Sequence, residues 1–371
     1  MKDTRDIIKD YTWIESTIKK IYSSGLRTQI FLSLNGKPKR IRDICNALNC
    51  KPQNASTRIK ELQDMFLVEY KKEGYVLTVM GEIIKHKTLE LNAESIGHII
   101  DKDYGKIELA IKKIYTSCLR TKIFISLNKK PKKLSDIYAV VSCKPQNASA
   151  VIKELQKMLL VENTGEGYVL TVWGEVIRYK TLEIIKILNT FKKHDDWWMS
   201  HIVEIPNEFL YDLDALSNSE IIGSDVDILS AHNEHIAVIK KARELKVITP
   251  VFYSDFVEAL FERTKKGLKT ELVITPEIVR YISTIMLKEN SKLIDIFKSK
   301  NISVAKMKNG LKMGLTLTEK TMMLGLYKFD NSYDFFSHFK SSDRNAVGWG
   351  DKLFRYFKKN SKIIKLKEFG I

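Results

Sequence analysis

The stretch CKPQNAS at residues 50–56 recurs unchanged at residues 143–149, and the interpretation of the whole chain starts from this pair. The same offset of 93 residues aligns residues 18–90 with residues 111–183 without a gap, and about two-thirds of the aligned positions are identical. A long repeat in two copies indicates a duplicated domain and not a solenoid. We call residues 18–90 the first repeat and residues 111–183 the second repeat.

The stretch lies within a pattern typical of a winged helix-turn-helix domain. In the first repeat we predict a short helix at 41–48, a tight turn at 49–51 and a second helix from Pro52, where proline costs no hydrogen bond. One face of this second helix is apolar and carries Ala55, Ile59, Leu62 and Phe66. Alternating residues at 67–70 and 75–78 then predict a β-hairpin, the wing. The second repeat follows the same order.

The polar face of the helix that begins at Pro52 has the side chains that DNA recognition needs. The amides of Gln53 and Asn54 can bond bidentately to an adenine edge, and nearby cations can meet phosphates. The predicted DNA-binding residues of the first repeat are Lys51, Gln53, Asn54, Ser56, Thr57, Arg58, Lys60, Lys71 and Lys72. Those of the second repeat are Lys144, Gln146, Asn147, Ser149 and Lys153. A merely solvated face would look similar, but the full order of elements, found twice, favours DNA.

The repeats differ at positions that matter for this prediction. The differing pairs are Thr57 and Ala150, Arg58 and Val151, Lys71 and Thr164, and Lys72 and Gly165. The second repeat instead carries lysines at positions 129, 130, 132 and 133, so its charge is displaced. We therefore expect the first repeat to make more of the specific contacts.

The distribution of charge supports a polyanionic partner. The chain has 371 residues, with 62 Lys and Arg against 45 Asp and Glu, a formal net charge of +17. Each repeat carries +7, residues 184–351 are neutral, and residues 352–371 carry +6. An excess concentrated on the two repeats is what DNA-binding domains should show. The basic tail, residues 352–371, stays unassigned.

The second half of the sequence alternates helix-like and strand-like segments, which predicts a mixed sheet with helices packed on it. The predicted helices are 234–245, 255–265, 276–287 and 349–359; the predicted strands are 247–253, 272–275, 302–307, 311–317 and 322–327. The fold class is thus α+β and multidomain. The domains we expect are two winged helix-turn-helix domains at 1–97 and 98–186, a linker helix and connector at 187–216, and an α/β effector domain at 217–371.

Several short motifs carry a resemblance to a known family. They are LRTQI at 26–30, HDDWWMSH at 194–201, TPVF at 249–252 and GWGDKLF at 348–354. On these, the chain resembles archaeal winged-helix transcription regulators of the Fil-type methanogenesis regulatory family. The resemblance implies a regulator whose C-terminal domain senses a signal, through a small-molecule effector of unknown identity, or forms a homodimer. That domain is also similar to the ligand-sensing domain of archaeal sugar-responsive regulators and to half of a phospholipase D fold, without its catalysis. The family usually has one winged domain, so the duplication is a departure.

Catalytic and metal-binding motifs are not expected. The sequence has no phosphate-binding Gly-rich loop and no Gly-x-Ser-x-Gly motif. We also expect no phospholipase D-type pair, in which a histidine precedes a lysine by two residues. His201, His232 and His235 lack a cysteine or acidic frame at the usual metal-ligand spacing. We predict no enzyme, no cofactor and no metal site.

Two alternatives stay open at this stage. Winged domains can dock proteins, so the chain could act in transcription as an interaction module without direct DNA readout. Cys50 and Cys143 precede the two predicted recognition helices, so a redox- or metal-responsive switch is a weaker alternative. Four cysteines fit a reducing cytoplasm, where we expect the protein. The sequence contains no run of 18 apolar residues, so we expect no membrane-spanning helix. The N-terminus lacks the apolar core of a signal peptide.

Overall fold

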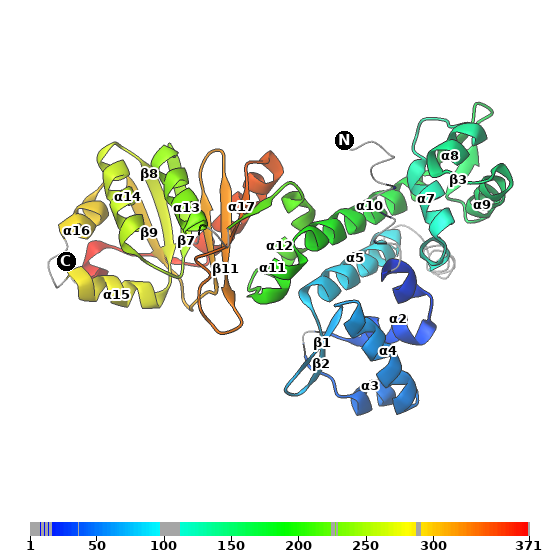
Figure 1. Cartoon of the computed structure of the whole chain (residues 1–371), viewed down its shortest axis with the longest axis horizontal. Helices are drawn as coiled ribbons and strands as arrows, with labels where there is room; N and C mark the ends of the chain where they lie inside the picture. Colours follow the sequence, from blue (N-terminus) through cyan, green and yellow to red (C-terminus); the bar gives the residue numbers. More distant parts are fainter. Residues whose placement is uncertain are drawn as a thin grey trace. The chain divides into compact units, whose positions relative to one another are not determined.

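The computed structural model contains helices and sheets in two compact units, Met1–Phe191 and Lys192–Ile371 (Figure 1). It describes residues 8, 11, 14, 17–35, 37–96, 112–223, 227, 229–286 and 291–369. Within these residues, no helix has the length and the apolar character needed to cross a membrane.

After a helical segment that includes residues 17–22, the first repeat folds as three short helices, a two-stranded hairpin and a longer helix. These elements are α2 (Gly25–Ser33), α3 (Ile41–Leu48), α4 (Pro52–Asp64), β1 (Val68–Lys71), β2 (Gly74–Leu77) and α5 (Val79–Ile96). The side chain of Ser24 accepts a hydrogen bond from the Arg27 N–H and so caps α2. Helix α3 ends at Asn49, whose left-handed backbone (φ 48°) turns the chain toward α4. Both helices that were predicted around the turn are present.

The second repeat has the same elements in the same order. They are α7 (Cys118–Ser126), α8 (Leu134–Val141), α9 (Pro145–Lys157), β3 (Val161–Asn163), β4 (Tyr168–Leu170) and α10 (Val172–Lys193). Ser117 caps α7 as Ser24 caps α2, and Ser142 takes the left-handed backbone of Asn49 with φ 55°. The repeated sequence therefore produces a repeated backbone. Residue 186, where the sequence analysis places a domain boundary, lies inside α10.

A close approach of backbone explains one pair of glycines that the repeats share. A Cβ on Gly81 would lie 2.2 Å from the carbonyl oxygen of Leu67, and a Cβ on Gly174 would lie 2.2 Å from that of Leu160. No side chain tolerates such a contact, so only glycine lets α5 and α10 begin so close to the preceding hairpin strands. The core of the first unit then extends through both repeats as one cluster, from Phe31 and Ile59 to Phe124 and Ile152.

The second unit is built on a nine-stranded mixed sheet with the order β13-β9-β8-β7-β10-β11-β12-β6, and β5 pairs with β11. The strands are β5 (His201–Ile202), β6 (Glu220–Ile222), β7 (Glu244–Thr249), β8 (Lys269–Ile274), β9 (Ile302–Lys306), β10 (Met313–Leu317), β11 (Met322–Lys328), β12 (His338–Ser341) and β13 (Lys362–Ile363). β7, β8 and β9 are parallel, whereas β10 pairs antiparallel to β7. The sheet therefore changes direction between β7 and β10.

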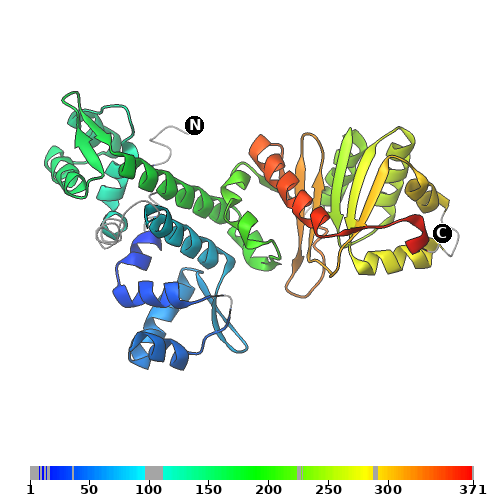
Figure 2. The same ribbon diagram turned by 180° about the vertical axis from the view of Figure 1, so that it is seen from behind.

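Helices cover both faces of this sheet. They are α11 (Asp195–Ser200), α12 (Asn207–Leu210), η1 (Leu213–Leu216), α13 (Ser230–Lys241), α14 (Ser254–Lys265), α15 (Pro276–Met286), α16 (Ser291–Lys298), α17 (Arg344–Lys359) and η2 (Leu366–Phe369). Helices α13 and α14 lie on one face, and α17 lies on the other (Figures 1 and 2). The predicted combination of a mixed sheet with packed helices is present in this unit.

Three predicted helix boundaries are wrong by four residues or more, and the first is the start of the helix predicted at 234–245, which begins at Ser230. The helix predicted at 234–245 ends at Lys241, because Ala242 is extended and the Arg243 N–H bonds the carboxylate of Glu319 beside the start of β7. The last helix begins at Arg344 and not at residue 349. The Asp343 side chain accepts a hydrogen bond from the Asn345 N–H, and this cap starts the helix earlier than the apolar pattern indicated.

Candidate nucleic-acid interface and a histidine pocket

Helix α4 buries one face and exposes the other, but Phe66, which was predicted for the apolar face, lies beyond the helix end at Asp64 and is exposed. Ala55, Ile59 and Leu62 are fully buried. The exposed side chains are those of Lys51, Gln53, Asn54, Ser56, Thr57 and Lys60. Pro52 occupies the first turn, so its missing N–H leaves no gap in the helix ladder. The predicted amide and lysine side chains of the first repeat thus share one solvent-facing surface at the helix N-terminus.

Helix α9 presents the matching surface in the second repeat. Lys144, Gln146, Asn147 and Lys153 are exposed, and Ser149 is half-buried. At a helix N-terminus the free backbone N–H groups and the helix dipole favour a negatively charged partner. Both repeats therefore offer two amide side chains and flanking lysines at a helix end suited to a phosphate backbone.

Arg58 is engaged inside the first repeat. Its Nη1 lies 2.6 Å from Oε1 of Glu61, and the Nε of Arg27 lies 2.7 Å from Oε2 of the same carboxylate. Although burial works in the opposite direction, the hydrogen bonds from Arg58 and Arg27 lower the pKa of Glu61. The predicted role of Arg58 at DNA would require this half-buried ion pair to open.

The hairpin tips of the two repeats differ in charge. Lys71 and Lys72 are exposed, and Nζ of Lys71 lies 3.1 Å from the carboxylate of Glu69. In the second repeat Thr164 and Gly165 occupy these positions, and the Thr164 hydroxyl donates to the carbonyl oxygen of Gly167. The first tip can approach a phosphate with two cations, which the second tip cannot.

One lysine of the 129–133 cluster has a structural role. Nζ of Lys132 donates to the carbonyl oxygen of Ser126 at 2.6 Å, as Nζ of Lys39 donates to that of Ser33 at 2.6 Å in the first repeat. The charge that the second repeat offers to a partner therefore comes from the exposed neighbours at positions 129, 130 and 133.

Two thiols near helices α4 and α9, those of Cys45 and Cys143, are poorly suited to redox chemistry. Cys45, Cys50, Cys118 and Cys143 are free cysteines that are buried or half-buried. Burial, together with the neighbouring Cys50, raises the pKa of the Cys45 thiol, and burial alone raises the pKa of the Cys143 thiol. A raised pKa keeps the thiol protonated and therefore less nucleophilic.

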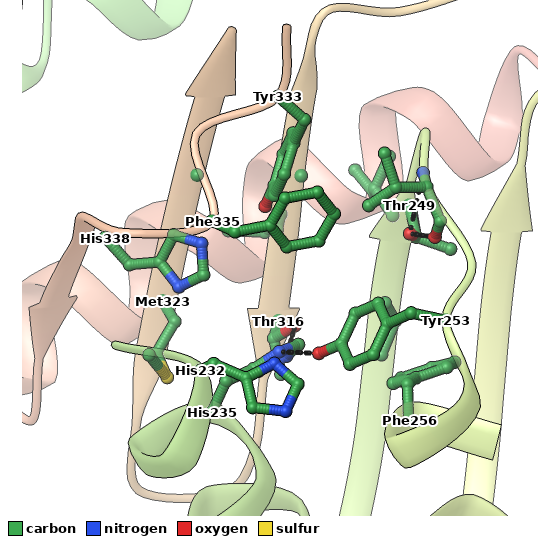
Figure 3. Close-up of a pocket in the computed structure, with 16 residues that line it drawn as sticks. His232, His235, Thr249, Tyr253, Phe256, Thr316, Met323, Tyr333, Phe335 and His338 are labelled. Carbon is green, nitrogen blue, oxygen red and sulfur yellow. Dashed lines mark hydrogen bonds between the residues drawn. The ribbon is translucent and has the colours of Figure 1, made fainter. Parts of the chain in front are cut away.

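A second candidate site lies in the C-terminal unit, where α13 faces β10 and β12 (Figure 3). His235 is fixed at both ring nitrogens: Nδ1 lies 2.7 Å from the Tyr253 hydroxyl and Nε2 lies 2.8 Å from the Thr316 hydroxyl. His338 is also buried, but its Nε2 has no hydrogen-bond partner within the described part of the chain. The enclosed space is about 20 Å³, enough for about one water molecule.

The pocket is uncharged and mostly apolar, with a few polar groups. None of the 16 lining residues is a Lys, Arg, Asp or Glu. Burial, with a smaller effect of the neighbouring histidines, lowers the pKa of His235 to about 3, and burial lowers the pKa of His338 to about 4. Burial also raises the pKa of Tyr253 and Tyr333. At neutral pH the pocket therefore offers a neutral imidazole nitrogen and aromatic faces, which suit an uncharged hydrogen-bonding group.

The sequence analysis did not predict this pocket. It also overlooked a histidine–lysine pair on one of the strands that line it. The expectation that no histidine precedes a lysine by two residues is wrong, because His338 and Lys340 flank Phe339 on β12. Residues two apart on a strand share a face. However, Nζ of Lys340 lies 2.8 Å from the carboxylate of Glu234, so its charge is already neutralised. The ion pair between Lys340 and Glu234 joins two elements that are far apart in the sequence. No local sequence pattern could have predicted it.

Of the three histidines considered for metal binding, His232 and His235 both line the pocket, whereas His201 is not among its lining residues. His201 bonds the carboxylate of Asp334 at 3.0 Å through Nε2 and the carbonyl oxygen of Trp197 at 2.6 Å through Nδ1. His232 bonds Asp255 at 2.8 Å, and His235 is held in the pocket. The residues that the structure describes contain no group of three or more potential metal ligands.

The Asp334 carboxylate anchors the loop that precedes β12. Burial favours its protonated form, but hydrogen bonds from His201 and Ser337 hold its pKa well below the usual range. Nζ of Lys328 adds an ion pair at 3.5 Å. This loop carries Tyr333 and Phe335, which line the pocket opposite α13 (Figure 3).

The basic C-terminal segment belongs to the second unit. Leu353 and Phe354 of α17 are buried in its core. Lys358 pairs with Glu271, and Nε of Arg355 lies 2.7 Å from the carboxylate of Asp351. Two of the seven cations that the sequence places at 352–371 are therefore opposed by acidic residues outside this segment.

The comparisons with known proteins agree on one family. The N-terminal domain of the methanogenesis regulatory protein FilR1 matches twice, at residues 15–97 and 108–191, and the FilR1 middle domain matches residues 228–360. The methanogenesis regulatory protein FilR1 of Methanothrix harundinacea (strain 6Ac) is 24% identical over 262 residues. This match covers 68% of the chain and 57% of that relative, so the chain spans little more than half of the relative's length.

A solved structure is similar over part of the chain. It is described as the structure of TrmBL2, an archaeal chromatin protein, showing a novel mode of DNA binding. The match covers 71% of this chain and 100% of that one at 13% identity, with a TM-score of 0.32. A TM-score of this size does not establish a shared fold.

Proposed function

From the premise that this chain belongs to the FilR1 family of methanogenesis regulatory proteins, we propose that it is a transcription regulator that binds specific sequences in double-stranded DNA. The two repeats, within residues 1–97 and 98–186, act as winged helix-turn-helix domains. α4 and α9 enter the major groove, and the β1–β2 and β3–β4 hairpins are the wings. This role places the protein in the cytoplasm.

One observation carries the proposal: both repeats expose the same amide pair at the N-terminus of the same helix. Gln53 and Asn54 in α4 are matched by Gln146 and Asn147 in α9, and all four are exposed. Exposed positions tolerate change more readily than core positions, yet this pair is identical in the two repeats. Bidentate bonds from such amides to adenine would give sequence readout, and the flanking lysines would supply affinity through phosphates.

The C-terminal unit has a regulatory role in this proposal and no catalytic one. The histidine pocket provides a place for a small uncharged effector, because His338 Nε2 is buried without a partner among the described residues. A ligand larger than water would have to displace the loop that carries Tyr333 and Phe335. The alternative role for this unit is the contact with a second copy of the chain.

The test is a binding titration of the full chain with fluorescent duplexes selected from a random-sequence library. Selected duplexes should bind more tightly than scrambled ones of equal length. With about six phosphate contacts, affinity should fall roughly a thousandfold between 50 and 200 mM salt. The Lys320→Ala variant, which removes an exposed cation of the second unit, is the matched control and should bind as the parent does.

A flat salt response, with equal affinity for selected and scrambled duplexes, would contradict DNA readout. It would favour the second candidate function, in which the repeats dock a protein of the transcription machinery. The charge of +7 on each repeat argues against that function, because protein interfaces are depleted in lysine.

A further inference from the structure

The two repeats touch each other through equivalent residues. Tyr22 and Tyr115 are counterparts at the 93-residue offset, and their ring centroids lie 5.1 Å apart. Both side chains are buried. Each hydroxyl is bonded inside its own repeat, that of Tyr22 to Thr88 at 2.6 Å and that of Tyr115 to Thr181 at 3.0 Å. The two rings are thereby held in the same orientation within each repeat and meet at the contact between repeats.

A second pair of counterparts meets at the same place. Lys87 and Lys180 are also 93 residues apart, and their Nζ atoms lie 3.6 Å and 3.4 Å from Oε2 of Glu183. The two ammonium groups are therefore within about 7 Å of each other. Both lysines are almost fully buried, which requires an acidic partner for each charge.

Contacts between counterparts have a geometric meaning. An interface in which both partners use the same patch is isologous, and the operation that relates such partners is a two-fold rotation. A head-to-tail arrangement brings two different patches together and separates counterparts. Each repeat uses the same surface patch at this contact. Tyr22 lies against Tyr115, and Lys87 lies beside Lys180. These two contacts are those expected when an approximate two-fold axis passes between the pairs and relates the repeats.

From this contact we propose that a single chain binds DNA as a two-fold dimer does, on an imperfect inverted repeat. A tandem duplication in sequence would by itself suggest a direct repeat, because the two domains follow each other in the same direction. The two-fold relation instead turns α9 opposite to α4, so the two half-sites must run in opposite directions along the duplex. This inference rests on the proposed function and adds the symmetry of the DNA site.

The half-sites should be unequal because the DNA-facing surfaces of the repeats are unequal. Thr57 faces solvent where the second repeat has Ala150, and the cationic tip at Lys71 and Lys72 has no counterpart. The shared amide pair should specify the same bases in both arms. The arm under the first repeat should extend further, because the hairpin tip there adds phosphate contacts.

The experiment is selection of bound duplexes from a random library with the full chain, followed by counting chains per duplex by mass photometry. The expected result is two arms related by inversion, with one chain on each duplex. A direct repeat, or a single unrepeated arm, would overturn the inference and leave DNA binding intact. Two chains on each inverted repeat would also overturn it, because the symmetry would then come from a homodimer. Failure to enrich any sequence would overturn the proposed function and this inference with it.

A synthetic duplex gives an independent measurement. Reversing one arm of the selected site keeps its base composition and changes only its direction. The affinity should then fall by about 10- to 100-fold, the decrease expected when one arm's bidentate contacts are broken. An unchanged affinity would overturn the inference. A duplex in which bases outside both arms are scrambled serves as the control and should bind unchanged.

Discussion

In the first repeat two arginines, Arg27 and Arg58, hold the carboxylate of Glu61. In the second repeat its counterpart Glu154 is bonded by Arg120 at 2.8 Å, and a valine, Val151, replaces the other arginine. The bond between the start of the repeat and helix α4 or α9 is present in both repeats, whereas the second arginine on that carboxylate is present only in the first.

Other bonds inside the repeats follow the same rule. The hydroxyl of Thr78 donates to the carbonyl oxygen of Phe66 at 2.7 Å, and that of Thr171 donates to Leu159 at 2.7 Å. Interactions that hold the fold are thus shared, as is the exposed amide pair, whereas the hairpin tips and position 57 differ between the repeats.

Acid should separate the unfolding of the second unit from that of the repeats. His235 and His338 are neutral when folded, with pKa values of about 3 and 4, whereas an unfolded histidine titrates near 6.5. The unfolded state therefore binds more protons between these values. The two neutral histidines make their full contribution to the free energy of unfolding above about pH 6.5. This free energy should fall by several kcal/mol, on the order of 5, as the pH drops toward 4.

Thermal melting between pH 7 and pH 4.5 measures this effect. Tryptophan fluorescence reports mostly on the second unit, which contains Trp197, Trp198 and Trp349, whereas circular dichroism reports on both units. The His338→Gln variant cannot titrate and should lose part of the acid dependence. If the fluorescence transition stayed at the same temperature over this range, the buried neutral histidines would not have the assigned effect.

Alanine at either of the two shared glycines should damage its repeat to the same degree. Gly81→Ala and Gly174→Ala each place a Cβ 2.2 Å from a carbonyl oxygen, so each should destabilise by about 3 kcal/mol. Chemical denaturation followed by circular dichroism measures the change. Gly25→Ala is the control, because a Cβ there meets nothing within 4 Å, and its effect should be within about 0.5 kcal/mol. Tolerance of one variant and not the other would show that the two cores are not equivalent.

Removing the amide pair from one repeat at a time should weaken sequence-specific DNA binding. The double variant Gln53→Ala with Asn54→Ala should lose about 10- to 100-fold in affinity for the selected duplex. Gln146→Ala with Asn147→Ala should lose less, because the second repeat has fewer supporting contacts. Binding to scrambled duplexes should change little in either variant. Equal decreases on selected and scrambled duplexes would mean that the amides do not read bases.

The hairpin tips should set part of the salt dependence. Replacing Lys71 by Thr and Lys72 by Gly gives the first tip the sequence of the second. The slope of log affinity against log salt should become shallower by roughly 2, because each lysine that no longer meets a phosphate reduces it by close to one. A salt titration of the same duplex measures the slope, with Lys320→Ala as the control. An unchanged slope would place both lysines away from the phosphates.

Exchange of the residues at positions 58 and 151 should have the smallest effect. Arg58→Val removes a half-buried ion pair with Glu61, which costs about 0.5 kcal/mol of stability after allowance for solvent screening. DNA affinity should change by less than about threefold, because Arg58 is already engaged within the repeat. A loss of sequence preference after the exchange, measured by repeating the library selection, would show that Arg58 leaves Glu61 and reads DNA.

Local sequence patterns determined much of this protein. The 93-residue offset established the two repeats, the apolar spacing of Ala55, Ile59 and Leu62 predicted the buried face of α4, and the exposed amide pair followed from the same spacing. These features depend on residues within one or two helical turns, so periodicity is enough to find them. The alternation of helices and strands likewise predicted the mixed sheet, with errors at both ends of α13, at the start of α17 and in the bounds of β7 and β8.

Contacts between distant residues were decided only by the tertiary structure. The pairing of Arg27 with Glu61, of Lys340 with Glu234 and of His235 with Thr316 depends on which faces pack together. The basic tail became part of the second unit in the same way. Tyr22 and Tyr115 are visible in the sequence as equivalents, but their contact, and the two-fold axis it implies, exists only once both repeats are folded. Sequence repetition specifies two equal parts, whereas the direction in which they meet is set by the surface that they bury together.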